Sequence, residues 1–556
     1  MYPNPYEGLN PSAIGRPMVG LAEQEKSIMR ARFGSSFIAL ILAVGSLIGP
    51  RIAAAQDGPE MTVSDLGVST VVSGLVTPTS MAFLGSNDLL VLEKNTGRVV
   101  RVTDGAIAGT ALDLGVNFAS ERGLLGIALH PDFPTDPGVY LFWSCPGTPP
   151  PAENPFFPVE QECADQPSIG ADTGDTLATP MLGNRVDRFE WNAASGTLTF
   201  DFNLVKLLAF QNDGAPVPPN QNDDGTGTNP QQIPRANHDG GVIDFGPDGK
   251  LYVIFGDAGR RGQLQNLVCG PTATTCPGTT TPDDQFGGPQ PDDEHFTGVV
   301  LRLNDDGSTP TDNPFFGVGA SMGGEVGANL QTVFSYGIRN SFGMDFDPRS
   351  GALWTQENGE DAYDELNRVT SGQNSGWIQL AGPASRVADF KAIETTSLHH
   401  EDFPNLQQFR WGPERIADTP AEALSRLFVV PGSQYSDPEF SWKHVLAPAA
   451  IGFMQGRGLG PQYDGDLFVG MSVPEPLGGP LFHFNLTGNR RAIGVDDPRL
   501  EDRVADNLDF HEMTESESLL VGTGFGIVTD VEPSPDGTLY VVSLDQGAIH
   551  EVSRAQ

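Results

Sequence analysis

Short apolar runs and polar turns alternate along the chain in one recurring pattern from about residue 57 onward. Each copy has an apolar strand, a turn with Pro, Asp or Gly, and a second strand rich in β-branched and aromatic residues. Six copies are visible, at 80–102, 126–144, 241–257, 343–359, 450–472 and 529–552. Because helical periodicity is almost absent, the pattern predicts an all-β fold, a six-bladed β-propeller with one four-stranded blade per copy and with 66–76 or 547–554 closing the ring.

The copies are separated by more residues than compact blades need. Roughly 500 residues over six blades give about 83 per blade, against about 40–45 for compact propeller repeats. The excess falls in loops rich in Pro, Asn, Asp and Gly at 145–180, 210–235 and 260–295, and in 381–435, which holds the only helix that we expect, around Pro420–Leu427. Because inserted loops on one face of a propeller commonly build its binding site, we predict a propeller with long inserted loops.

Residues 1–55 differ from the predicted propeller, 56–556. An apolar run, SSFIALILAVGSLI, covers 35–48 behind two arginines, and three alanines precede Gln56. Because this run is shorter than the roughly 18–20 apolar residues that a membrane span needs, we expect a signal peptide and no stable span after its cleavage. The predicted location is periplasmic or extracellular, and an uncleaved anchor is the alternative.

Charge and cysteine content narrow the function classes. The chain has 71 acidic and 32 basic residues, a formal net charge of -39 at pH 7, which argues against nucleic acid or anionic membrane as partners. The four cysteines form two local pairs in loops. In an exported chain, this spacing predicts structural disulfides between Cys145 and Cys163 and between Cys269 and Cys276, each stabilising the fold by about 2–4 kcal/mol.

Candidate chemistry is concentrated in 336–367. Arg339 and Asn340 occupy a polar turn, where a cation and an amide can face a ligand together. The acidic sequence ENGEDAYDELN, 357–367, contains a glycine and offers both carboxylate and backbone oxygens. Oxygens of these kinds are the ligands that calcium prefers, so the loop is a candidate cation site.

Five motifs in this order resemble one known family, the soluble quinoprotein glucose dehydrogenases, or glucose/sorbosone dehydrogenases. They are ERGLLGIALHPDF (121–133), NHDGGVIDFGPDGKLYVIFGDAG (237–259), YGIRNSFGMDF (336–346), QENGEDAYDELN (356–367) and NSGW (374–377). The resemblance covers about 66–145, 184–205, 233–380 and 440–554. It implies a six-bladed propeller that uses pyrroloquinoline quinone (PQQ) and Ca²⁺ to oxidise an aldose sugar and passes electrons to an external acceptor.

The resemblance also implies roles for single residues. His238 is the expected general base, because it matches the family's histidine and an imidazole accepts a proton near neutral pH. Asn237 stands beside it where the family has Asp. Arg339 and Asn340 match the pair that contacts the quinone, and a guanidinium stabilises the negative charge of the reduced ring. Glu121 matches a polar position near the cofactor.

At the expected calcium site and at the remaining cofactor contacts, this sequence departs from the pattern of the family. Gly359 and Glu360 match the positions whose backbone carbonyls hold Ca²⁺, although the family has Pro where this chain has Glu360. An Arg-x-Arg expected before the last repeat is replaced by Ile-Val-Thr-Asp at 527–530, and the lysine expected within 470–484 is missing. Burying the three carboxylates of PQQ beside few cations is costly.

Two alternatives therefore stay open beside the dehydrogenase. One is a catalytically inactive, calcium-stabilised propeller that binds carbohydrate or protein, which the missing basic residues favour. The other is a calcium-dependent, lactonase-like hydrolase, which would need side-chain calcium ligands at the centre rather than the Gly359 loop. Fold alone does not decide among the three.

Overall fold

A computed structural model describes residues 58–118, 121–146, 181–207, 238–257, 298–396, 416–473 and 478–555. The predicted signal peptide, most of the inserted loops, Asn237, Cys163, Cys269 and Cys276 lie outside these residues. Cys145 is described and buried. Because at least one cysteine of each predicted pair lies outside the described residues, both disulfide pairings stay predictions. No helix in the described ranges is long and apolar enough to cross a membrane.

Three sheets come from the first half of the described chain. The first contains β3 (Pro78–Gly85), β4 (Asp88–Glu93), β5 (Arg98–Thr103) and β6 (Ala106–Asp113). The second contains β7 (Leu124–Leu129), β8 (Gly138–Pro146), β9 (Met181–Asn192) and β10 (Thr197–Leu207). The third contains, in spatial order, β11 (Ile243–Phe245), β12 (Leu251–Phe255), β13 (Val299–Leu303), β14 (Val333–Tyr336), β18 (Gln373–Asn374) and β19 (Gln434–Tyr435).

Three further sheets complete the arrangement. The fourth contains β15 (Met344–Phe346), β16 (Leu353–Glu357), β17 (Ala362–Val369), β20 (Phe440–His444) and β26 (Val504–Ala505). The fifth contains β21 (Pro448–Phe453), β22 (Leu467–Met471), β23 (Leu481–Phe484), β27 (Leu520–Thr523) and β1 (Glu60–Met61). The sixth contains β28 (Val528–Pro533), β29 (Leu539–Ser543), β30 (Ala548–Arg554) and β2 (Leu66–Ser73), and a separate two-stranded sheet joins β24 (Leu486–Thr487) to β25 (Ala492–Ile493).

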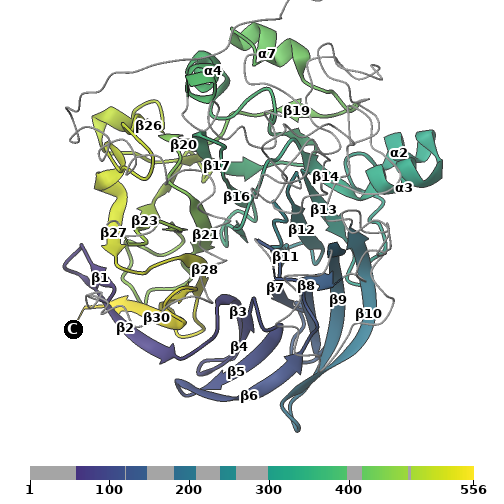
Figure 1. Ribbon diagram of the computed structural model, residues 1–556, viewed down its shortest axis with the longest axis vertical. Helices are drawn as coiled ribbons and strands as arrows, with labels where there is room; N and C mark the ends of the chain where they lie inside the picture. The colour runs from purple at the N-terminus through teal and green to yellow at the C-terminus, as the bar shows by residue number, and fades with distance from the viewer. Residues whose placement is uncertain are drawn as a thin grey trace, which may run out of the picture.

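The sheets surround a central axis, as Figure 1 shows. Each predicted repeat begins one sheet, and the inner strands β3, β7, β11, β15, β21 and β28 contact one another in sequence, with β28 returning to β3. The all-β, propeller-like arrangement is therefore confirmed. The expectation of four strands in every sheet is wrong for the third, fourth and fifth sheets, which recruit short extra strands. The number of six blades stays a prediction, which the six sheets of four or more strands support.

The ring is closed by strands from opposite ends of the described chain. Strand β2 pairs antiparallel with β30, from Leu66 opposite Arg554 to Ser73 opposite Ala548. This pairing confirms the predicted closure. It also completes the sixth sheet, whose other strands all come from the C-terminal part of the chain.

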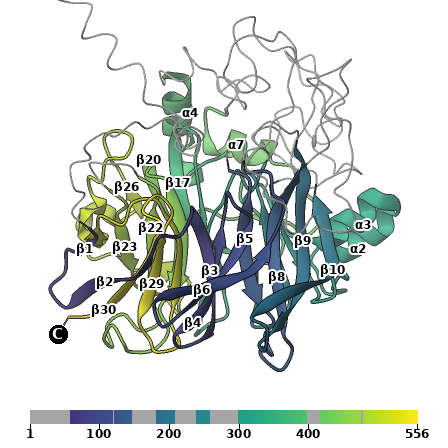
Figure 2. The ribbon, with the colours of Figure 1, turned by 60° about the horizontal axis from the view of Figure 1, so that its bottom comes forward.

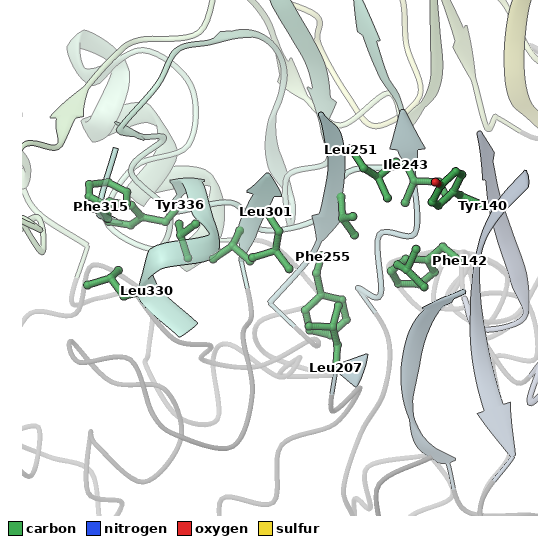
Figure 3. Packing of buried hydrophobic residues seen from close by; sticks show 14 of the residues in the cluster. Tyr140, Phe142, Leu207, Ile243, Leu251, Phe255, Leu301, Phe315, Leu330 and Tyr336 are labelled. Atoms are coloured by element: carbon green, nitrogen blue, oxygen red, sulfur yellow. The ribbon is translucent and has the colours of Figure 1, made fainter. Parts of the chain in front are cut away.

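The core lies between neighbouring sheets. The second strand of each sheet packs on both faces, so its sequence is a nearly continuous apolar run, as in LYVIF of β12, where every residue is buried. Figure 3 shows the cluster between the second and third sheets, where Tyr140 and Phe142 of β8 approach Ile243 of β11 and Leu251 of β12. A sheet removed from the ring would expose such a surface on both sides.

Within the described ranges, four α-helices lie outside the sheets, and only one of them was expected from the sequence. Helix α7 (Pro420–Arg426) is confirmed, and its N-cap Thr419 accepts a hydrogen bond from the Glu422 amide. The expectation of no other helix is wrong, because α2 (Phe316–Met322), α3 (Gly324–Thr332) and α4 (Val387–Thr396) are also present. Short 3-10 turns cover Ala384–Arg386, Pro498–Leu500 and Ser516–Leu519. Figure 2 shows α4 and α7 at one end of the strands and α2 and α3 at the side of the ring.

Helices α2 and α3 contain several glycines, which weaken the helical signal in the sequence but allow the two helices to pack closely. A Cβ atom at Gly319 would lie 2.3 Å from the Gly327 carbonyl oxygen, and the reverse distance is the same. Side chains would therefore force these helices apart. Glycine weakens an isolated helix, but here tertiary contact between the two helices outweighs that preference.

Aspartates on the inner strands connect neighbouring sheets. Asp345 of β15 accepts a hydrogen bond from the Phe453 amide of β21 at 2.6 Å, and Asp530 of β28 accepts one from the Met81 amide of β3 at 2.8 Å. Burial raises the pKa of both carboxyl groups to about 7. The folded protein therefore retains protons that the unfolded chain, with a pKa of 3.8, has already released.

This proton uptake predicts a pH-dependent stability. Because the folded state binds more protons than the unfolded state between pH 3.8 and about 7, the free energy of unfolding should fall as pH rises through this window. Asp530→Asn removes one of the titrating groups and should flatten this dependence. Urea denaturation at several pH values measures it. The exposed Asp496→Asn variant is the control, and an unchanged slope in Asp530→Asn would contradict the prediction.

Candidate functional site

The predicted site residues lie on loops at one end of the inner strands. Glu121 precedes β7, His238 precedes β11, and Arg339 and Asn340 precede β15. Loops before inner strands from different sheets meet near the axis, so residues far apart in sequence become neighbours there. A cavity of about 100 Å³ opens at this end and is lined from all six sheets, with mainly apolar residues beside Lys94, Glu121 and Asn358.

A buried carboxylate holds the His238 ring in place. The Nδ1 atom lies 2.6 Å from Oδ1 of Asp257, and the other oxygen of Asp257 accepts a hydrogen bond from Nε1 of Trp377 at 2.9 Å. An ionised carboxylate at this distance favours the tautomer with the proton on Nδ1. Nε2, which makes no hydrogen bond with other described residues, is then the ring's proton acceptor.

The backbone around His238 is also unusual. Its φ angle is 59°, in the left-handed region that residues other than glycine rarely adopt. A Cβ atom at Gly256 would lie 2.3 Å from the His238 carbonyl oxygen, so only glycine allows this close approach at the end of β12. The tight fit between these two segments sets the direction of the imidazole.

Glu121 connects His238 with the Arg339–Asn340 turn. Its Oε2 atom accepts a hydrogen bond from the His238 amide at 2.5 Å and another from Nδ2 of Asn340 at 3.2 Å. Glu121 also lines the axial cavity. The carboxylate therefore joins three sheets at the point where their loops meet.

Arg339 makes several contacts with neighbouring protein groups. Its amide donates to Glu357 at 2.6 Å, and its guanidinium carbon lies 5.6 Å from the centre of the Trp377 ring. Nη1 donates to the Asn358 carbonyl at 2.9 Å, while Nε and Nη2 both donate to Oε2 of Glu360. Arg339 and Glu360 thus form a buried ion pair, with side chains only 9% and 7% exposed.

The turn at Gly359 and Glu360 is constrained by its own backbone. A Cβ atom at Gly359 would lie 2.1 Å from the Ala362 carbonyl oxygen, so the turn needs glycine there. The Gly359 amide donates to Asp364 at 2.9 Å. Burial raises the pKa of Asp364 to about 6, against the effect of its backbone hydrogen bonds.

Helix α4 adds a further carboxylate to this turn. Glu394 is buried and accepts hydrogen bonds from the amides of Asp361 and Ala362, at 3.0 and 3.2 Å. Burial, together with the charges of Asp361 and Glu360, raises the pKa of Glu394 well above its ordinary value. Crowded carboxylates of this kind favour the approach of a cation. Within the described ranges, however, no three His, Cys, Asp or Glu side chains are arranged to hold a metal ion.

Two cations that were not singled out from the sequence lie beside Glu121, the buried Lys94 and the half-buried Arg122. Burial, with the charge of Arg122, lowers the pKa of Lys94 to about 7. Burial likewise lowers the pKa of Arg122, and it raises that of Asp239 to about 6. Lys94 lines the cavity and donates to the Phe118 carbonyl at 3.1 Å.

The structure brings the described candidates into one connected network. Glu121 contacts His238 and Asn340, and Arg339 contacts Glu360 next to Gly359. Of these residues, Glu121 lines the cavity, whereas His238, Arg339, Gly359 and Glu360 do not. Asn237 lies outside the described residues. The roles of all these residues stay predictions.

Asp257 and Trp377 belong to this network but were not predicted from the sequence. Both lie inside the motifs that carry the family resemblance, FGDAG and NSGW. Their position inside these motifs was the one signal in the sequence that could have pointed to them. Nothing in the spacing shows that an aspartate at the end of β12 and a tryptophan 120 residues later share a hydrogen bond.

Comparison with known proteins adds independent information. The model of the family described as glucose/sorbosone dehydrogenase matches residues 75–154 and 227–394. Quinoprotein glucose dehydrogenase B of Acinetobacter calcoaceticus is 29% identical over 317 residues, which are 56% of this chain and 52% of that protein. Aldose sugar dehydrogenase of Escherichia coli is 25% identical over 316 residues, 56% of this chain and 60% of that protein.

The resemblance to the glucose/sorbosone dehydrogenase family is confirmed. The aligned region spans about half to three-fifths of the length of these two glucose/sorbosone dehydrogenase relatives. The crystal structure of the soluble aldose sugar dehydrogenase of Escherichia coli in its apo-form has the same fold. It superposes with a TM-score of 0.51 at 20% identity and covers 88% of this chain and 99% of that one.

The position of Glu121 in the network predicts a stability effect. Glu121→Ala leaves the amide of His238 and the Nδ2 group of Asn340 buried without their acceptor, which should lower the free energy of unfolding by about 1–3 kcal/mol. Glu121→Gln keeps one acceptor oxygen and should lose less. Urea denaturation measures the change against the exposed control Glu501→Ala. Equal stability of Glu121→Ala and wild type would show that Glu121 does not hold the network together.

Proposed function

We propose that this protein oxidises an aldose sugar, with PQQ and Ca²⁺ as cofactors and His238 as the general base. The observation that carries the proposal is the His238–Asp257 contact at 2.6 Å, buried at the end of the inner strands. The family resemblance supports sugar oxidation as the class of reaction. Export and transfer of electrons to an external acceptor belong to the same proposal.

The residues of the chain account for the proton transfer. With the proton of the neutral ring on Nδ1, Nε2 of His238 accepts a proton from a sugar hydroxyl, and the ring becomes an imidazolium. Asp257 stabilises that positive charge and keeps the ring from rotating, while Trp377 holds the second oxygen of Asp257. His238 is thus the proposed catalytic residue, and Asp257 is a positioning residue.

The site offers hydrogen-bond donors of the kind that an anionic quinone requires. Arg339, Asn340 and Lys94 would hold it, and Lys94 partly replaces the basic residues that the sequence lacks at 470–484 and 527–530. An approaching anion would favour the protonated form of Lys94, whose pKa is lowered to about 7 by burial and by Arg122. When bound, PQQ would supply the electron acceptor and Ca²⁺ would polarise it.

The Gly359–Glu360 turn offers carbonyl and carboxylate oxygens, which are the ligands that Ca²⁺ prefers. The backbone carbonyls of these two residues are the proposed ligands, and the nearby carboxylates Asp364 and Glu394 add negative charge. The buried Oδ1 atoms of Asn340 and Asn358 have no hydrogen-bond partner among the described residues. Unsatisfied acceptors of this kind can accept a hydroxyl proton of a sugar or a water molecule.

A second candidate function is a calcium-stabilised propeller that binds carbohydrate without oxidising it. The specific observation in its favour is the buried Arg339–Glu360 ion pair, in which the guanidinium already has a carboxylate partner. Both candidates use the same end of the propeller. Binding of PQQ separates them.

Substitution of His238 tests the general base. His238→Gln removes the proton acceptor but retains a polar side chain, so kcat for aldose oxidation should fall at least about 100-fold while PQQ binding stays nearly unchanged. The assay is dye-linked sugar oxidation after reconstitution with PQQ and Ca²⁺, beside a PQQ titration. The control is His130→Gln, which alters a histidine at the far end of β7. Activity within a fewfold of wild type would rule out His238 as the base.

Substitution of Asp257 tests the positioning role. Asp257→Asn keeps the shape of the side chain but removes the charge that stabilises the imidazolium, so kcat should fall on the order of 100-fold with little change in KM. The exposed variant Asp496→Asn is the control. A change in KM alone would argue that Asp257 only maintains the fold.

A further inference from the structure

Internal acceptors already use three of the five N–H donors of the Arg339 guanidinium. Glu360 takes Nε at 3.1 Å and also Nη2, and the Asn358 carbonyl takes Nη1 at 2.9 Å. An arginine binds a carboxylate or quinone oxygen strongly when it presents two parallel N–H groups. Here an internal carboxylate already occupies the Nε–Nη2 edge.

The position of Arg339 depends on several contacts besides Glu360. Its amide donates to Glu357, its carbonyl accepts from the Asp257 amide at 2.8 Å, and its guanidinium carbon lies 5.6 Å from the centre of the Trp377 ring. Removal of the Glu360 charge would therefore leave the guanidinium near its present place. It would also leave a buried positive charge without its ion-pair partner, a state that an incoming anion relieves.

We propose that Glu360 limits the binding of anions at Arg339 and so sets the affinity of the site for its anionic cofactor. An incoming anion must displace the Glu360 carboxylate or lie close beside it, and both cost binding free energy. The inference rests on the proposed function in so far as the anion is PQQ. The part that concerns Arg339 and Glu360 applies to any small anion that reaches the guanidinium.

A titration of wild type and Glu360→Gln with PQQ tests this directly. In excess Ca²⁺ and without sugar, isothermal titration calorimetry should give a dissociation constant at least about tenfold lower for Glu360→Gln than for wild type. The glutamine keeps the size of the side chain and one acceptor oxygen but removes its charge. Inorganic sulfate serves as a second probe and should bind more tightly to the variant as well.

Two controls separate this effect from a general change in charge or stability. Glu501→Gln removes one exposed carboxylate elsewhere and should leave PQQ affinity unchanged. The double variant Arg339→Ala/Glu360→Gln should lose the whole gain, because the gain depends on the guanidinium. Thermal unfolding and circular dichroism confirm that each variant is folded, and Glu360→Ala replaces Glu360→Gln if that variant does not fold.

The outcomes distinguish this inference from the proposed function. The affinity of wild type for PQQ tests the cofactor assignment, whereas the difference between wild type and Glu360→Gln tests the role of Glu360. Binding by the variant but not by wild type would support the inference and overturn the cofactor assignment. Equal or weaker binding of both PQQ and sulfate by Glu360→Gln, including no binding by either protein, would overturn the inference.

Discussion

Closure of the ring is the constraint on which the rest of the structure depends. The apolar strands of each sheet are buried only when neighbouring sheets cover both faces, so no sheet has a complete core alone. Pairing of β2 with β30 completes the last sheet with strands from both ends of the described chain, and the Asp530 carboxylate of that sheet accepts a hydrogen bond from the Met81 amide of the first sheet. The site requires this closure as well, because its cavity is lined from all six sheets.

Charge at the end of the inner strands has two opposing effects. Carboxylates give the network its hydrogen bonds, as Glu121 does for His238 and Asn340, and they favour a cation. The same carboxylates disfavour an anionic cofactor. Both effects concern Arg339, since its partner Glu360 forms an ion pair with it in the folded protein and occupies the Nε–Nη2 edge of its guanidinium.

Much of the fold was predictable because its signals are local. Alternating apolar runs and Pro/Asp/Gly turns identified the beginning of every sheet, and the Pro420 helix carries a capping Thr419 and a proline that sequence shows directly. The helices α2, α3 and α4 were not predictable in this way. The packing of Gly319 against Gly327 stabilises α2 and α3 against their own weak helix preference, and this contact exists only in the folded chain.

The sequence by itself determined the repeat, the acidic character and the family motifs that contain His238, Arg339 and the Gly359 loop. Only the tertiary structure decided which side chains touch. Asp257 orients His238, and Glu360 pairs with Arg339, although neither contact follows from spacing. Lys94 becomes a buried neighbour of Glu121 through the meeting of two sheets. The physical reason is that loops from different sheets converge at the axis, where contacts depend on closure of the ring and not on separation along the chain.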